Sequence, residues 1–153
     1  MGNAALTVML VAGAAGTLTG GQLADRVDRR LVLGGYMAVL PPLLAALLAT
    51  KDPVLAIVLA ALVGFATIGN FSLTVVMGQE YLPTRQALAS GITLGLAIGI
   101  GGLIAAALGP VADSAGVDAA LWVLVLLPVP AVALAASLPS MSPAVRQAPD
   151  LAL

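Results

Sequence analysis

The chain has 153 residues, of which 61% are hydrophobic and only 8% are charged, and its formal net charge is −1. Because soluble domains keep about a quarter of their residues charged, this composition excludes an ordinary water-soluble domain. Cysteine and histidine are both absent, which excludes disulfides, cysteine nucleophiles and the commonest metal ligand. We therefore expect no metal site and no cofactor. The six basic residues form no patch, so we also expect no nucleic-acid partner.

Charge-free runs of membrane-spanning length divide the sequence into five predicted transmembrane helices. A spanning helix needs about 20 predominantly apolar residues, and the short alternating segments of a membrane barrel do not occur. We predict an all-α integral membrane fold, a helical bundle over residues 1–138 followed by a disordered cytoplasmic tail at 139–153. The five spans are expected at about 3–21, 31–50, 54–78, 87–108 and 119–138.

Proline and glycine predict where these helices bend and end. Pro41–Pro42 should kink the second span, and Pro128 with Pro130 should bend the fifth. Asp52–Pro53 offers an N-cap and a first helical residue for the third span. Gly109–Pro110 should close the fourth span, which leaves residues 112–118 as an outer turn.

The positions of the basic residues predict the orientation in the membrane. If the loop between the first two spans is cytoplasmic, five basic residues lie inside and only Lys51 lies outside, as the positive-inside rule expects. The N-terminus is then outside and the C-terminus cytoplasmic. The five inside residues are Arg26, Arg29, Arg30, Arg85 and Arg146.

The first loop has a specific order of residues. Small residues end the first span at Gly20–Gly21, an Asp25–Arg26 pair follows, and Arg29–Arg30 open the second span. This order resembles G-x-L-a-D-R-x-G-R-R, the loop signature of the major facilitator superfamily of secondary transporters. Asp28 stands where that family has glycine, and aspartate tolerates the left-handed turn that glycine suits.

A second set of segments resembles the same family. The segments Gly78–Pro83, Ala89–Gly95, Gly101–Leu103 and Leu108–Asp113 look like the tenth and eleventh helices of the fosmidomycin-resistance branch, which comprises drug efflux antiporters of bacterial inner membranes. A complete member has twelve helices in two six-helix halves. The resemblance implies that this chain corresponds to helices 8–12, an incomplete C-terminal half, and that its first partner is the absent N-terminal half.

The resemblance also implies a conformational latch in the motif loop, which consists of Gly21, Asp25, Arg26, Arg29 and Arg30. In the family, the carboxylate equivalent to Asp25 meets the N-terminus of a helix in the opposite half, where a negative charge is stabilised. Rocking of the halves breaks this contact. The alternative is that Asp25 only caps a turn and that the arginines only set the topology.

Two further groups are candidates for substrate contact and for helix packing. Thr67, Asn70 and Thr74 share one face of the third span, and the family's tenth helix lines the substrate cavity. The threonines could instead bond back to their own helix. Gly91, Gly95 and Gly99 form a packing ridge on the fourth span, like Gly13, Gly16 and Gly20 on the first. Each ridge could face the other half or pack within this chain.

We therefore predict the C-terminal part of a secondary active transporter, a proton-coupled drug efflux antiporter of the bacterial inner membrane. Its partners would be the lipid bilayer, the N-terminal half and a small-molecule drug or metabolite. Glu80 should pair with Arg85 or a neighbouring loop. No nucleophile–base pair, carboxylate pair or phosphate loop is present, so we predict no enzyme. The alternative is a stand-alone membrane interaction protein or an inactive transporter remnant.

Overall fold

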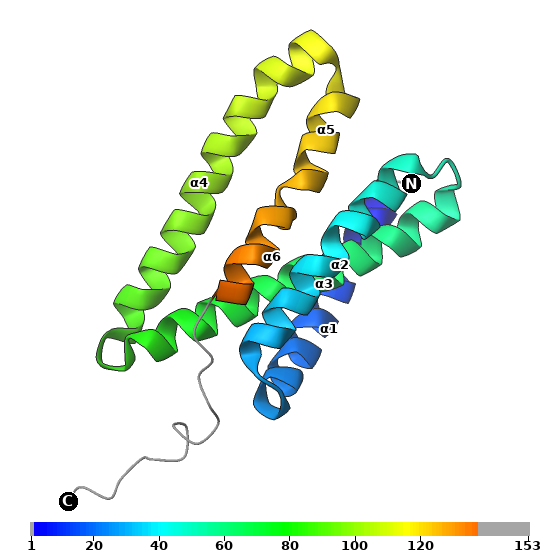
Figure 1. Ribbon diagram of the computed structural model, residues 1–153. Coiled ribbons are helices and arrows are strands. Elements are labelled where there is room, and N and C mark those ends of the chain that lie inside the picture. The colour runs from blue at the N-terminus through cyan, green and yellow to red at the C-terminus, as the bar shows by residue number, and fades with distance from the viewer. Residues whose placement is uncertain (1, 138–153) are drawn as a thin grey trace, which may run out of the picture.

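The computed structural model describes residues 2–137, all of whose regular elements are helices (Figure 1). Five helical segments are long and apolar enough to cross a membrane, which confirms the all-α membrane fold. The tail predicted at 139–153 lies outside the described residues. The elements are α1 (Gly2–Arg26), α2 (Arg29–Ala49), α3 (Pro53–Tyr81), the 3-10 turn η1 (Pro83–Arg85), α4 (Gln86–Ala115), α5 (Val117–Leu126) and α6 (Pro128–Ser137).

The N-termini of α2 and α3 are each capped by an aspartate. As expected, the Asp52 carboxylate accepts from the backbone N–H of Val54 at 2.8 Å, and Pro53 occupies the first helical position. Asp28 caps α2 in the same way and accepts from the N–H of Arg30 at 3.1 Å. The expected left-handed turn at Asp28 is wrong, because its φ is −57°. Asp28 instead acts as an N-cap, in which its side-chain oxygen satisfies a backbone N–H of the first turn of α2.

Several predicted helix ends are wrong, since the helices run further than the turn residues indicated. Helix α1 includes Asp25 and Arg26, so only Val27 and Asp28 lie outside a helix between α1 and α2. Helix α4 passes through Gly109–Pro110 and ends only at Gly116, whose φ of +89° favours glycine. Proline is tolerated within membrane helices, and α2 likewise continues through Pro41–Pro42. The predicted bend of the last span takes the form of a break at Leu127, between α5 and α6.

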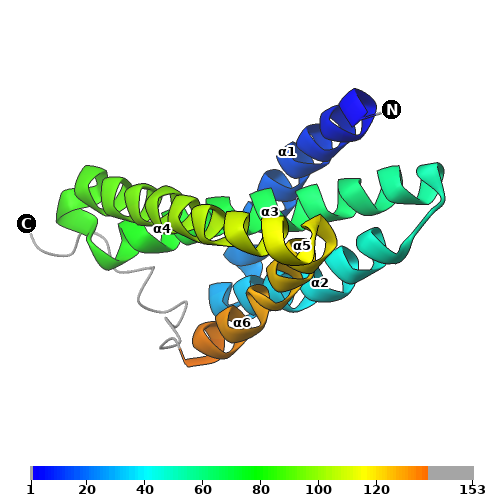
Figure 2. The same ribbon diagram turned by 90° about the horizontal axis from the view of Figure 1, so that it is seen from above.

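Glycines bring α1 and α3 into close contact where they cross (Figure 2). A Cβ added at Gly16 of α1 would overlap the Phe65 carbonyl of α3, and one added at Gly64 of α3 would overlap the Met9 carbonyl of α1. Close backbone approach of this kind is the usual basis of helix association in lipid. The first glycine ridge therefore packs within this chain.

The packed core lies between α2 and α3, with α1 completing one of its two clusters. That cluster contains Ala24, Val32, Leu33 and Leu73, and the other contains Leu40, Val63 and Ala66. Tyr36 packs against both clusters and so joins them. Helix α4 contributes little to the core, because Ala89 is its only buried residue in the described chain.

Candidate functional site

The motif residues lie at the end of the bundle where α1 finishes and α2 begins. Asp25 and Arg26 occupy the last turn of α1, and Arg29 and Arg30 occupy the first turn of α2. Their exposure differs strongly, since the Arg29 side chain is 12% exposed and the Asp25 side chain is 73% exposed. The loop therefore directs one charge into the protein and another outward.

Arg29 forms an ion pair with Glu80 in the last turn of α3, through Nη1 and Oε1. This confirms the prediction that Glu80 pairs with Arg85 or a neighbouring loop, and it identifies the partner as the motif loop. Arg29 Nη2 also lies 3.9 Å from Asp25 Oδ1, one turn earlier in the chain. One guanidinium thus connects the ends of α1, α2 and α3.

The Asp25 carboxylate does not stabilise its own helix. It lies in the last turn of α1, where the helix dipole is negative and repels a negative charge. The N-cap of α2 is provided by Asp28 and not by Asp25. Asp25 is therefore not the N-cap of α2, and its exposed carboxylate lies 3.9 Å from Arg29 Nη2.

The three polar residues of α3 lie in different surroundings. Asn70 is buried, with 8% of its surface exposed, whereas Thr67 and Thr74 are exposed. The Thr74 hydroxyl donates to the Asn70 carbonyl at 2.9 Å, which is the back-bonding considered as its alternative role. Among the described residues, Asn70 Oδ1 has no hydrogen-bond partner. The structure thus leaves a buried acceptor near the middle of α3, between Ala66 and Leu73 of the two core clusters.

The two glycine ridges have different surroundings. The ridge of α1 is covered, since a Cβ at Gly13, Gly16 or Gly20 would meet Ile68, Phe65 or Tyr36. A Cβ added at Gly91, Gly95 or Gly99 of α4 would meet no atom within 4 Å. The ridge of α4 consequently has no helix packed on it within the described chain.

Sequence reasoning missed two polar contacts between helices. The Tyr36 hydroxyl donates to the Gly16 carbonyl at 3.2 Å, beside the α1–α3 crossing, and its ring lies 6.0 Å from that of Phe65. A tyrosine in an apolar span needs such an acceptor, so its presence was the available signal. The Gln79 amide donates to the Ser90 hydroxyl at 2.7 Å and joins α3 to α4. No spacing rule relates those two residues.

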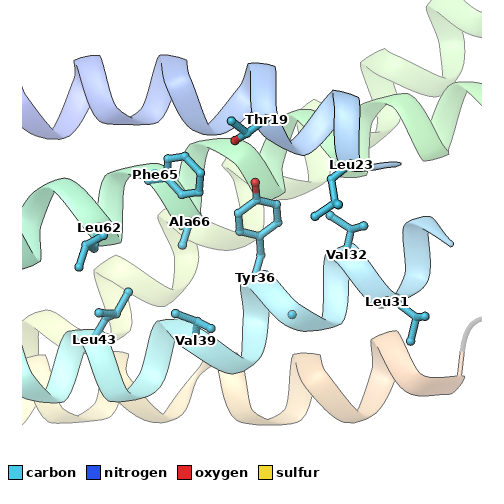
Figure 3. A pocket seen from close by; sticks show the side chains of 11 residues that line it. Thr19, Leu23, Leu31, Val32, Tyr36, Val39, Leu43, Leu62, Phe65 and Ala66 are labelled. Carbon is cyan, nitrogen blue, oxygen red and sulfur yellow. The ribbon is translucent and has the colours of Figure 1, made fainter. Parts of the chain in front are cut away.

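An open groove of about 470 Å³ lies between α1, α2 and α3 and was also missed (Figure 3). Its walls are almost wholly apolar, with Thr19 and Tyr36 as their polar members. Leu23, Leu31 and Val32 lie at one end, beside the motif loop, and Leu43 and Leu62 lie at the other. The groove therefore runs from the charged end of the bundle toward its middle.

The chain is similar to part of two known bacterial proteins. It is 43% identical over 122 residues to the MFS-type transporter YfnC of Bacillus subtilis, and 35% identical over 127 residues to the fosmidomycin resistance protein of Escherichia coli. Each alignment covers 80% of this chain and 30% of the relative, so the chain spans about a third of the length of these proteins. No family model and no solved structure matches it.

Proposed function

Because the chain belongs to the major facilitator superfamily and matches the C-terminal part of its relatives, we propose that it forms the C-terminal part of a secondary active transporter. The whole transporter would be a proton-coupled drug efflux antiporter of a bacterial membrane. The N-terminus of this chain would lie outside and its C-terminus in the cytoplasm. The name of the Escherichia coli relative supports an antibiotic of the fosmidomycin type as substrate.

The exposed Asp25 carboxylate is the observation that carries this proposal. Arg29 is held by Glu80 on the inner side of the motif loop, while Asp25 is directed outward from a helix end that disfavours it. A helix N-terminus in the other half of the transporter would supply the positive dipole that Asp25 lacks in its own helix. The contact would form in one state of the transport cycle and break in the other, as a latch does.

The uncovered ridge of α4 would be a second contact with the other half of the transporter, in addition to the contact made by Asp25. Gly91, Gly95 and Gly99 allow another helix to approach the backbone closely. The acidic and basic residues of this chain all lie at the ends of the predicted spans or outside them, whereas proton relays need an ionisable group within the membrane. We therefore assign the proton-carrying residue to the other half.

A resistance assay in an efflux-deficient bacterium tests the proposal. Three strains are compared. One expresses this chain alone, one expresses it together with the preceding helices of the Escherichia coli relative, and one expresses those helices alone. Membrane fractionation verifies insertion in each strain. We expect growth on fosmidomycin only when both parts are present.

Failure of both parts to confer resistance, despite insertion, would contradict the transporter assignment. The chain would then be an interaction protein or a remnant, and the uncovered ridge of α4 would be the surface that such a protein offers to its partner. Co-purification with a membrane partner, compared between the unmodified chain and Gly95→Leu, would separate those two alternatives. An interaction protein should lose its partner in the variant, whereas a remnant has no partner at this ridge.

A further inference from the structure

The groove between α1, α2 and α3 has the dimensions of a lipid site. Its α2 wall extends from Leu31 to Leu43, which is about 18 Å at the helical rise of 1.5 Å per residue. One leaflet contributes about 15 Å, half of the ~30 Å hydrocarbon core. The residues at its mouth are exposed, among them Leu23, Leu31 and Val39. An acyl chain entering from the bilayer would cover this apolar surface.

A cation lies at the end of the groove where a lipid headgroup would sit. Arg26 follows Thr19 and Leu23 at spacings of seven and three residues, so it shares the face of α1 that lines the groove. Arg26 is exposed and has no ion pair within the described chain. The neighbouring charges are engaged, since Arg29 pairs with Glu80 and Asp25, and Asp28 caps α2.

We propose that this groove binds one anionic phospholipid, with an acyl chain between α1, α2 and α3 and the phosphate on Arg26. Basic pockets between membrane helices are recognised sites for anionic headgroups, and each basic residue near the membrane surface attracts them. The occupant is a lipid and not a helix of the other half because a cation stands at the membrane-surface end of an otherwise apolar groove. This proposal requires only that the chain lies in a membrane, so it stands or falls independently of the transport function.

Lipid retention by the purified chain tests the proposal. The chain in detergent micelles is titrated with phosphatidylglycerol or with phosphatidylcholine of the same acyl composition, and retained lipid is counted by native mass spectrometry. We expect one phosphatidylglycerol to bind about fivefold more tightly than phosphatidylcholine. This ratio corresponds to about 1 kcal/mol for one arginine at the membrane surface.

Two pairs of variants locate the site. Arg26→Gln should remove the preference for phosphatidylglycerol, whereas Arg85→Gln, at the same end of the bundle, should retain it. Gly35→Leu places a side chain in the groove and should lower retention of both lipids several-fold. Gly34→Leu is its matched control, because both glycines have open space for a Cβ but only Gly35 lines the groove.

Three results would overturn the proposal. Equal retention of the two lipids by the unmodified chain would exclude an anionic headgroup site. Equal effects of Arg26→Gln and Arg85→Gln would show that charge acts without a site. Equal effects of Gly35→Leu and Gly34→Leu would show that the lipid does not bind in the groove, and a protein helix would then be the better candidate for its occupant. Circular dichroism of each variant confirms that its helices are intact, and the exposed Arg26 position tests the headgroup without altering the buried core.

Discussion

Arg29 at the start of α2 and Glu80 at the end of α3 form an ion pair that joins the motif loop to a helix distant in the sequence. The Arg29 side chain is mostly buried in this contact, while Asp25, one turn earlier, stays exposed. Two charges of the same motif thus have different surroundings. Arg29 pairs with another helix of the bundle, whereas the Asp25 side chain is exposed.

Glu80→Gln should destabilise the chain, because the Arg29 guanidinium would lose the closer of its two carboxylates and keep only the exposed Asp25 at 3.9 Å, while remaining largely shielded from water. We expect the free energy of unfolding to fall by about 1–3 kcal/mol, the usual cost of a buried polar group left unpaired. Unfolding in mixed detergent and SDS micelles measures the change. Asp113→Asn removes an exposed carboxylate from α4 and should stay within about 0.5 kcal/mol of the unmodified chain. Similar losses in both variants would argue against the ion pair.

Asp25→Asn should impair transport by the assembled protein while leaving the stability of the chain unchanged. The side chain is 73% exposed and its distance to Arg29 is 3.9 Å, so little folding energy depends on it. Substrate accumulation by cells expressing both halves measures transport, with membrane abundance determined in parallel. Asp113→Asn, at the far end of α4, serves as the control with the same loss of charge. Unimpaired efflux by Asp25→Asn would reject the latch.

Gly16→Leu and Gly95→Leu should fail in different ways. A side chain at position 16 would collide with the Phe65 backbone, so α1 could not cross α3 and the chain should lose its folded form. At position 95 the space is open, so the folded chain should persist. Co-purification of the two halves should nevertheless fall several-fold for Gly95→Leu. Undiminished recovery of a folded Gly95→Leu chain with its partner would exclude this ridge from the interface.

Asn70→Leu separates a structural role from a substrate contact. The buried Oδ1 has no partner in the described chain, so its replacement by an apolar side chain of similar size should not lower the free energy of unfolding. If Asn70 contacts substrate, transport should fall even though stability does not. Thr7→Val, which removes an exposed and back-bonded hydroxyl of α1, is the control, because Thr74 is itself a candidate for substrate contact. Transport equal to that of the control would remove Asn70 from the substrate cavity.

The number and type of helices could be predicted from the sequence because each depends on local composition. A charge-free run of about 20 residues is a spanning helix whatever it packs against, and Asp52 caps α3 through its own neighbours. Helix ends were less predictable. Gly109–Pro110 was expected to end a helix, but α4 continues to Ala115, because proline is tolerated within membrane helices.

The sequence by itself therefore determined that this is an all-α membrane protein with five spans and a charged motif between the first two. Only the tertiary structure decided which glycine ridge is covered, since Gly16 and Gly95 belong to similar small-residue patterns and differ only in the helix that crosses them. The same holds for the partner of Arg29. Contacts between residues far apart in the chain depend on where whole helices cross, and no local spacing encodes that position.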